Sequence, residues 1–109
     1  MNQDRLNKLL QFLEKDPDDS FTRYAIALEY QKSGQTEEAI RYYTRLAEIN
    51  PAYLGTWYQL GWCYEKTGNE EKARETYRLG IQQARLQGNQ HTLAELQNAL
   101  MKLELGEDI

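Results

Sequence analysis

The sequence predicts an all-α fold in which helical hairpins stack side by side as an α-α superhelix. Apolar residues recur at three- and four-residue spacing along most of the chain, which is typical of helices with one buried face. Shifting residues 20–53 by 34 positions aligns eight identical residues, and a period of this length is typical of stacked two-helix units. Glycine and proline separate the helical segments. We therefore expect two full hairpins, with an N-terminal half-repeat helix before them and a C-terminal capping helix after them.

Length and charge restrict the class of protein. With 109 residues, the chain is expected to form one domain, residues 1–109. Its net charge of -4 has the wrong sign for a surface that neutralises phosphates, so we expect no nucleic-acid partner. The first fifteen residues lack a continuous apolar run, which argues against a signal peptide and against contact with a membrane. A single cysteine cannot form an internal disulfide, and we expect a cytoplasmic protein.

The first predicted helix, over about residues 2–15, is amphipathic. Leu6, Leu9 and Leu13 recur on one side of it, and the helix is expected to end before Pro17 because a residue that precedes proline resists the α conformation. Pro17 lies 34 residues before Pro51, which closes the following hairpin. Residues 1–17 are therefore predicted to be the second half of a repeat.

Residues 20–53 are predicted to form the first full hairpin. Ile26 and Tyr30 lie on the apolar side of its first helix, and Gly34 permits the positive φ that ends a helix. Thr36 begins the second helix, and Asn50-Pro51 ends it. Asp18, Asp19 or Ser20 can cap the start of the hairpin, since short polar side chains accept hydrogen bonds from free N–H groups there.

Residues 54–87 are predicted to form the second hairpin, and residues 88–105 the capping helix. Gln87-Gly88-Asn89 is expected to end the second helix of the hairpin before the capping helix begins. The cap carries leucines on one side and polar residues opposite, which suits the end of a stack. The residues that define the second hairpin are Trp57-x2-Leu60-Gly61-x2-Tyr64 and Ala73-x3-Tyr77.

This pattern resembles the tetratricopeptide repeat, as found in small proteins of bacterial type. The signature of that family is a Trp, a Leu-Gly pair, a Tyr, an Ala, an aromatic residue and a closing Pro over 34 residues. Two residues depart from it, because Arg23 replaces the first Trp and Arg85 replaces the last Pro. We expect looser packing in the first hairpin as a result. The resemblance implies a scaffold that recognises other proteins, with the first helix of each hairpin lining a concave groove.

The groove positions implied by the resemblance are aromatic rather than basic. Family members that grip a terminal carboxylate use Lys, Arg and Asn there, so we reject a carboxylate-clamp role. An apolar strip of tyrosine and tryptophan suits the hydrophobic side chains of a peptide, because these two residues dominate binding hot spots. The candidate partner-binding residues are Phe21, Tyr24, Leu28, Lys32, Tyr58, Gln59, Trp62 and Lys66.

We therefore expect a non-catalytic protein–protein interaction module that binds a peptide or protein segment in this groove. Two alternatives stay open. The same groove can form a homo-oligomer interface in a structural or assembly module, since a large exposed apolar patch is uncommon on a small monomer. Alternatively, a terminal helix can cover the strip and make it part of the core. Either a monomer or a weak homodimer is compatible with the sequence.

The sequence gives little support to catalysis, to a metal site or to a cofactor. His91 is the only histidine and has no cysteine near it in the sequence to complete a metal set. Cys63 requires a base within hydrogen-bond reach to act as a nucleophile, and a half-buried structural role is more common for a free cysteine. Because the chain also lacks a glycine-rich phosphate loop, we expect no enzyme activity and no cofactor.

Overall fold

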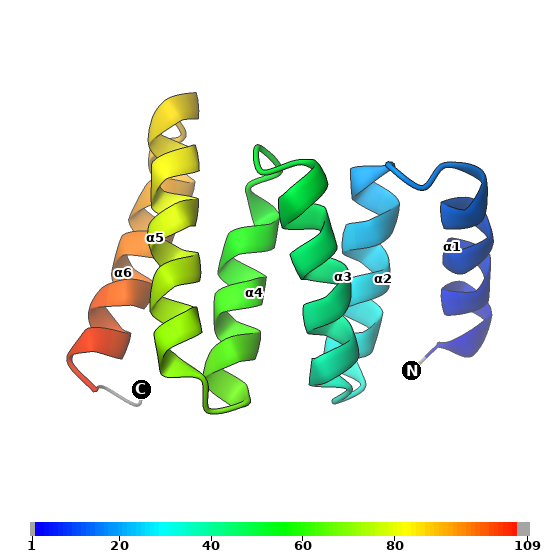
Figure 1. Ribbon diagram of the computed structural model, residues 1–109, viewed down its shortest axis with the longest axis horizontal. Helices are drawn as coiled ribbons and strands as arrows, with labels where there is room; N and C mark the ends of the chain where they lie inside the picture. The colour runs from blue at the N-terminus through cyan, green and yellow to red at the C-terminus, as the bar shows by residue number, and fades with distance from the viewer. Residues whose placement is uncertain (1, 107–109) are drawn as a thin grey trace.

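The computed structural model describes residues 2–106, and every regular element in this range is an α-helix (Figure 1). The ends of the predicted domain, residue 1 and residues 107–109, lie outside the described part. The helices are α1 (Gln3–Lys15), α2 (Ser20–Lys32), α3 (Thr36–Ile49), α4 (Gly55–Lys66), α5 (Glu70–Gln87) and α6 (Gln90–Glu104).

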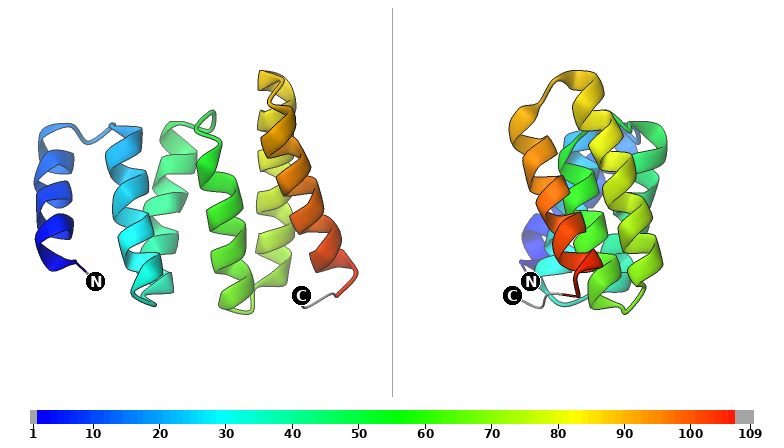
Figure 2. Two further views of the ribbon diagram at one scale, coloured as in Figure 1. Left: turned by 180° about the vertical axis from the view of Figure 1, so that it is seen from behind. Right: turned by 90° about the vertical axis from the view of Figure 1, so that its left-hand side faces the viewer.

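The six helices stand side by side along the longest dimension of the molecule (Figures 1 and 2). Helices α2 and α3 form one hairpin, α4 and α5 form the next, α1 packs on α2, and α6 packs on α5. The extents are 41 × 29 × 19 Å, as expected for a short stack that grows in one direction. The predicted all-α superhelix of hairpins is confirmed. No helix of residues 2–106 is long and apolar enough to span a membrane.

Short polar side chains and glycines set the helix boundaries. The Asp19 carboxylate accepts a hydrogen bond from the backbone N–H of Thr22 at 3.0 Å and caps α2, as the sequence predicted. Asn69 and Asn89 cap α5 and α6 in the same way. Gly34 has a φ of 83°, which a residue with a side chain rarely adopts, and it ends the turn after α2. Where the sequence predicted a helix boundary, as for α1 and α3, the structure has it within one or two residues.

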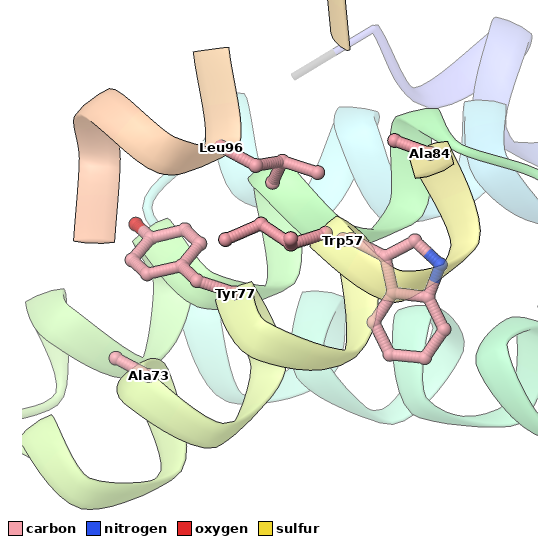
Figure 3. Packing of buried hydrophobic residues seen from close by; sticks show 6 residues of the cluster. Trp57, Ala73, Tyr77, Ala84 and Leu96 are labelled. Carbon is pink, nitrogen blue, oxygen red and sulfur yellow. The ribbon is translucent and has the colours of Figure 1, made fainter. Parts of the chain in front are cut away.

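Two clusters of buried side chains make up the core. One lies between α4, α5 and α6, and Trp57, Tyr77 and Leu96 contribute its largest side chains (Figure 3). The other joins the two hairpins, with Tyr43 of α3 packed beside Cys63 of α4. Tyr43 and Tyr77 are both fully buried, whereas Tyr30 and Tyr64, at the equivalent positions of the first helices, are half-buried.

Arg23, which stands in place of the first tryptophan, makes the same hydrogen bond to a proline carbonyl as the tryptophan of the second hairpin. Its Nη2 donates a hydrogen bond to the backbone carbonyl of Pro17 at 2.7 Å. One repeat later, the indole Nε1 of Trp57 donates to the carbonyl of Pro51 at 2.9 Å. The guanidinium of Arg23 also lies 6.0 Å from the ring centroid of Tyr42. Because a guanidinium can replace an indole as the donor, the exchange preserves the connection between the first helix and the preceding turn.

Candidate interaction face

The eight candidate residues lie on the first helices of the two hairpins. The candidates on α2 are three or four residues apart, and those on α4 lie at similar spacing one repeat later. Residues at this spacing lie on one side of a helix. Four residues are exposed or largely exposed, and the others are half-buried. We call this surface the α2/α4 face. Its members are Phe21, Tyr24, Leu28 and Lys32 on α2, and Tyr58, Gln59, Trp62 and Lys66 on α4, with Phe21, Lys32, Tyr58 and Lys66 the exposed ones.

A hydrogen-bonded chain links the two helices across this face. The amide Nε2 of Gln31 donates to Oε1 of Gln59 at 2.9 Å, and the hydroxyl of Tyr43 donates to Oε1 of Gln31 at 2.7 Å. Tyr43 thereby fixes the orientation of the Gln31 amide, and Gln31 fixes Gln59. Among residues 2–106, no acceptor takes a hydrogen bond from the Gln59 amide N–H groups. Gln31 is not among the eight candidates. It lies one repeat before Glu65, so the two residues occupy equivalent positions on α2 and α4.

Glu65 and Tyr77 repeat half of this arrangement in the second hairpin. The hydroxyl of Tyr77 donates a hydrogen bond to the Glu65 carboxylate. Burial of the ring, followed by this hydrogen bond, raises the pKa of the Tyr77 hydroxyl far above its usual value. The phenol therefore stays protonated and serves as a permanent donor. Each first helix thus carries a polar side chain that a buried tyrosine of the second helix holds in place.

Part of the candidate strip belongs to the core. The ring of Tyr24 lies 5.8 Å from that of Tyr43 and 5.4 Å from that of Tyr53, measured between centroids. Trp62 packs against the cluster that contains Tyr43 and Cys63. These half-buried rings contribute to stability as well as to the surface, so substituting them changes both.

Helix α4 also presents an accessible aromatic side chain on the α2/α4 face. Tyr58 is 40% exposed, and its ring centroid lies 6.4 Å from that of Tyr77. The ammonium of Lys66 lies 5.1 Å from the ring centroid of Trp62, within the range of a cation–π contact. An exposed phenol, an indole and a cation therefore follow one another along one side of α4.

Phe21 lies in a different environment from the other candidates. Although it is 65% exposed, it lines a hollow between α1 and α2. Leu9 and Phe12 of α1 line the same hollow. Phe21 therefore contributes to the N-terminal end of the stack.

Cys63 and His91, the two residues considered for catalysis, lie in different environments. Cys63 is fully buried, and burial raises the pKa of its thiol to about 11. The nucleophilic thiolate is correspondingly scarce near neutral pH. His91 is exposed, and its Nε2 lies 3.6 Å from a carboxylate oxygen of Glu95. Within residues 2–106, no group of three His, Cys, Asp or Glu side chains is placed to hold a metal ion.

We predict that the free energy of unfolding falls as the pH rises above about 9. In the unfolded chain Cys63 releases its proton near its ordinary pKa of 9.0, whereas the buried thiol keeps its proton up to about 11. The folded state then binds more protons than the unfolded state, so stability decreases with pH. Tyr43 and Tyr77 extend the decrease beyond pH 10, because burial also raises their pKa values.

Urea unfolding at pH 8 and pH 10.5 would check this expectation. A Cys63→Ala variant is the control, since its stability should fall less between the two pH values. Equal losses in both proteins would show that the thiol contributes nothing to the alkaline instability.

Comparison with known proteins places these helices in a wider context. A tetratricopeptide repeat family model matches residues 30–101, and a second tetratricopeptide repeat model matches residues 8–41. A tetratricopeptide repeat domain protein from Salinibacter ruber, solved by NMR, is 44% identical with a TM-score of 0.77. That match covers 82% of this chain and 90% of the other.

Two further structures share the fold at much lower identity. PcrH in complex with the chaperone binding region of PopD has a TM-score of 0.88 at 16% identity, covering 97% of this chain and 80% of the other. The TPR2B domain of yeast Sti1, in a complex with pHsp70, has a TM-score of 0.85 at 15% identity. That match covers 93% of this chain and 81% of the other.

Proposed function

Because the chain belongs to the tetratricopeptide repeat family, we propose that it binds a peptide or protein segment on the α2/α4 face. Domains of this family generally act as interaction modules without catalysis. The observation that carries the proposal is the surface of α4, where the exposed Tyr58 ring and the Trp62–Lys66 pair lie next to the Gln59 amide.

The chemistry of this face fits an extended segment with apolar and carbonyl groups. Tyr58 and Trp62 offer ring surface to apolar side chains, and aromatic residues of this kind are enriched in binding hot spots. Gln59 has amide N–H groups free to donate to a backbone carbonyl, since its Oε1 already accepts from Gln31. Because Tyr43 and Gln31 hold Gln59 in place, little side-chain entropy is lost when it binds.

Two structural neighbours support a segment as the ligand. PcrH was solved with the chaperone binding region of PopD, and the yeast Sti1 domain was solved with pHsp70. These neighbours share the fold with this chain, and each ligand is bound by the neighbour itself. They support the proposal that a stack of this size can hold a short segment of another protein.

Tyr58→Ala should weaken capture of the partner by about 30-fold, as expected for a hot-spot aromatic worth about 2 kcal/mol. Tyr58 is a better probe than Tyr24 or Trp62, because its larger exposure leaves the core intact. The measurement is affinity capture from lysate of the native cells, quantified by mass spectrometry for the wild type and the variant.

Phe12→Ala is the matched control, since Phe12 is an aromatic residue that is 66% exposed and lies on α1. It should retain the partner. If Tyr58→Ala and Gln59→Ala both retain every captured protein while remaining folded, the α2/α4 face is not the binding surface.

A further inference from the structure

Helix α1 exposes apolar side chains at positions that are buried elsewhere in the chain. Phe12 is 66% exposed and Leu9 is half-buried, and both line the same hollow. One repeat later, the equivalent residues are Leu46 and Tyr43, which are fully buried. Tyr43 packs beside residues of α2, the first helix of its own hairpin. Leu9 and Phe12 therefore present the surface against which a first helix normally packs.

Helix α6 shows the complementary condition at the other end of the stack. Leu96 faces α5 and is fully buried, so α6 packs on α5 as the first helix of a further hairpin would. Met101 of α6 and Leu105, directly after the helix, are 53% and 66% exposed. Together with Ile81 of α5, they line an end cleft of about 540 Å³ between α5 and α6. Helices α5 and α6 are the last two helices of the stack (Figure 2), so the end cleft lies at its C-terminal end.

The directions of the two terminal helices match the arrangement inside a hairpin. Helix α1 begins and helix α6 ends at the same edge of the molecule (Figure 1). If a second copy is placed end to end with the first, its α1 runs antiparallel to α6. The helices of the chain's own hairpins are also antiparallel, with α2 against α3 and α4 against α5 (Figure 1).

The charges at the two ends are also complementary. Asp16, directly after α1, lines the hollow between α1 and α2 together with Phe12. Arg85, in the last turn of α5, lines the end cleft. Helices α1 and α5 end at the same edge of the molecule, so end-to-end stacking brings the carboxylate of Asp16 toward the guanidinium of Arg85 (Figure 1).

We propose that the end cleft between α5 and α6 binds α1 of a second copy of this chain, so that α6 and the incoming α1 complete one hairpin in trans. The contact joins two different surfaces, and it therefore leaves one free cleft and one free α1 on every dimer. Further copies add at both ends, and the assembly grows with concentration. Phe21 lines the hollow beside α1, and it is the one residue of the α2/α4 face at this interface. The proposal does not depend on the function proposed for that face.

The test uses one variant for each end. Phe12→Arg places a charge in the docking surface of α1, and Met101→Arg does the same in the end cleft. Both side chains are more than half exposed, so each variant should keep the helix content and melting temperature of the wild type. Sedimentation velocity at two concentrations about a hundredfold apart, up to about 1 mM, gives the mass distribution.

The wild type should sediment above the monomer mass of 12.8 kDa at the higher concentration, and each variant alone should stay monomeric. An equimolar mixture should form dimers and nothing larger, because the Phe12→Arg chain keeps an intact cleft and the Met101→Arg chain keeps an intact α1. Tyr58→Ala should assemble like the wild type, which separates this contact from the α2/α4 face. A monomeric wild type at both concentrations, or variants that assemble like it, would overturn the proposal.

Discussion

Gly80→Ala should lower the free energy of unfolding by about 2–3 kcal/mol, because overpacking at a fixed contact outweighs the gain in helix propensity. A Cβ atom on Gly80 would lie 2.5 Å from Cβ and 2.9 Å from Cγ of Trp57, and 3.0 Å from Cδ1 of Leu96. The Cβ of Trp57 is attached directly to the backbone of α4, so no rotamer change can relieve the overlap. Helices α4 and α5 would have to move apart.

Thermal unfolding followed by circular dichroism would measure the effect. A loss of this size should lower the melting temperature by about 10–20 °C in a domain of this length. Gln82→Ala is the control, since Gln82 is exposed on the same helix and its substitution should change stability by less than about 0.5 kcal/mol. An unchanged melting temperature for Gly80→Ala would show that α4 and α5 can separate without loss of packing.

The positions of the helices could be predicted because their determinants are local. Apolar spacing, the Asp19 cap and glycines such as Gly34 act within a few residues of the chain. The 34-residue identities then fixed which helices pair, since equivalent segments adopt equivalent structures. Gly80 did not stand out in the sequence, because its role depends on Trp57, a residue on another helix.

Arg23 illustrates the limit of a residue-by-residue comparison with a pattern. Its place in the sequence indicated a missing tryptophan and therefore looser packing. The structure shows that the hydrogen bond from this position to the preceding proline carbonyl is kept, at 2.7 Å from Arg23 and 2.9 Å from Trp57. What the repeat requires here is a long side chain with an N–H donor, and two chemically different residues supply it.

The candidate face was predictable in its location and less so in its exposure. The resemblance to the tetratricopeptide repeat assigned its residues to the first helix of each hairpin, where the structure has Tyr58 and Lys66 exposed. The sequence could not show that Tyr24 packs on Tyr53 or that Phe21 lies beside α1, because both depend on how neighbouring helices are placed. The Gln31–Gln59 bond likewise requires α2 and α4 to lie side by side.

Gly61→Ala should also destabilise the protein by about 2–3 kcal/mol, although the clash differs in kind. A Cβ atom on Gly61 would lie 2.2 Å from Cε1 and 2.6 Å from Cδ1 of Tyr77. The ring of Tyr77 is fully buried and its hydroxyl is bonded to Glu65, so it has no space into which to turn. Alanine occupies the equivalent position 27 in the first hairpin, which shows that the glycine is required by this ring and not by the repeat as such.

A double-mutant cycle distinguishes the two glycines. Tyr77→Ala removes the three atoms nearest to the new methyl group at Gly61, and it leaves a cavity. In that background Gly61→Ala should be neutral or stabilising, by up to about 1 kcal/mol, because alanine favours the helix and fills part of the cavity. Trp57→Ala should not rescue Gly80→Ala in this way, because alanine keeps the Cβ atom that makes the nearest contact. If Gly61→Ala is equally destabilising with and without the ring, the clash with Tyr77 is not the cause, and the requirement for glycine lies in the backbone of α4.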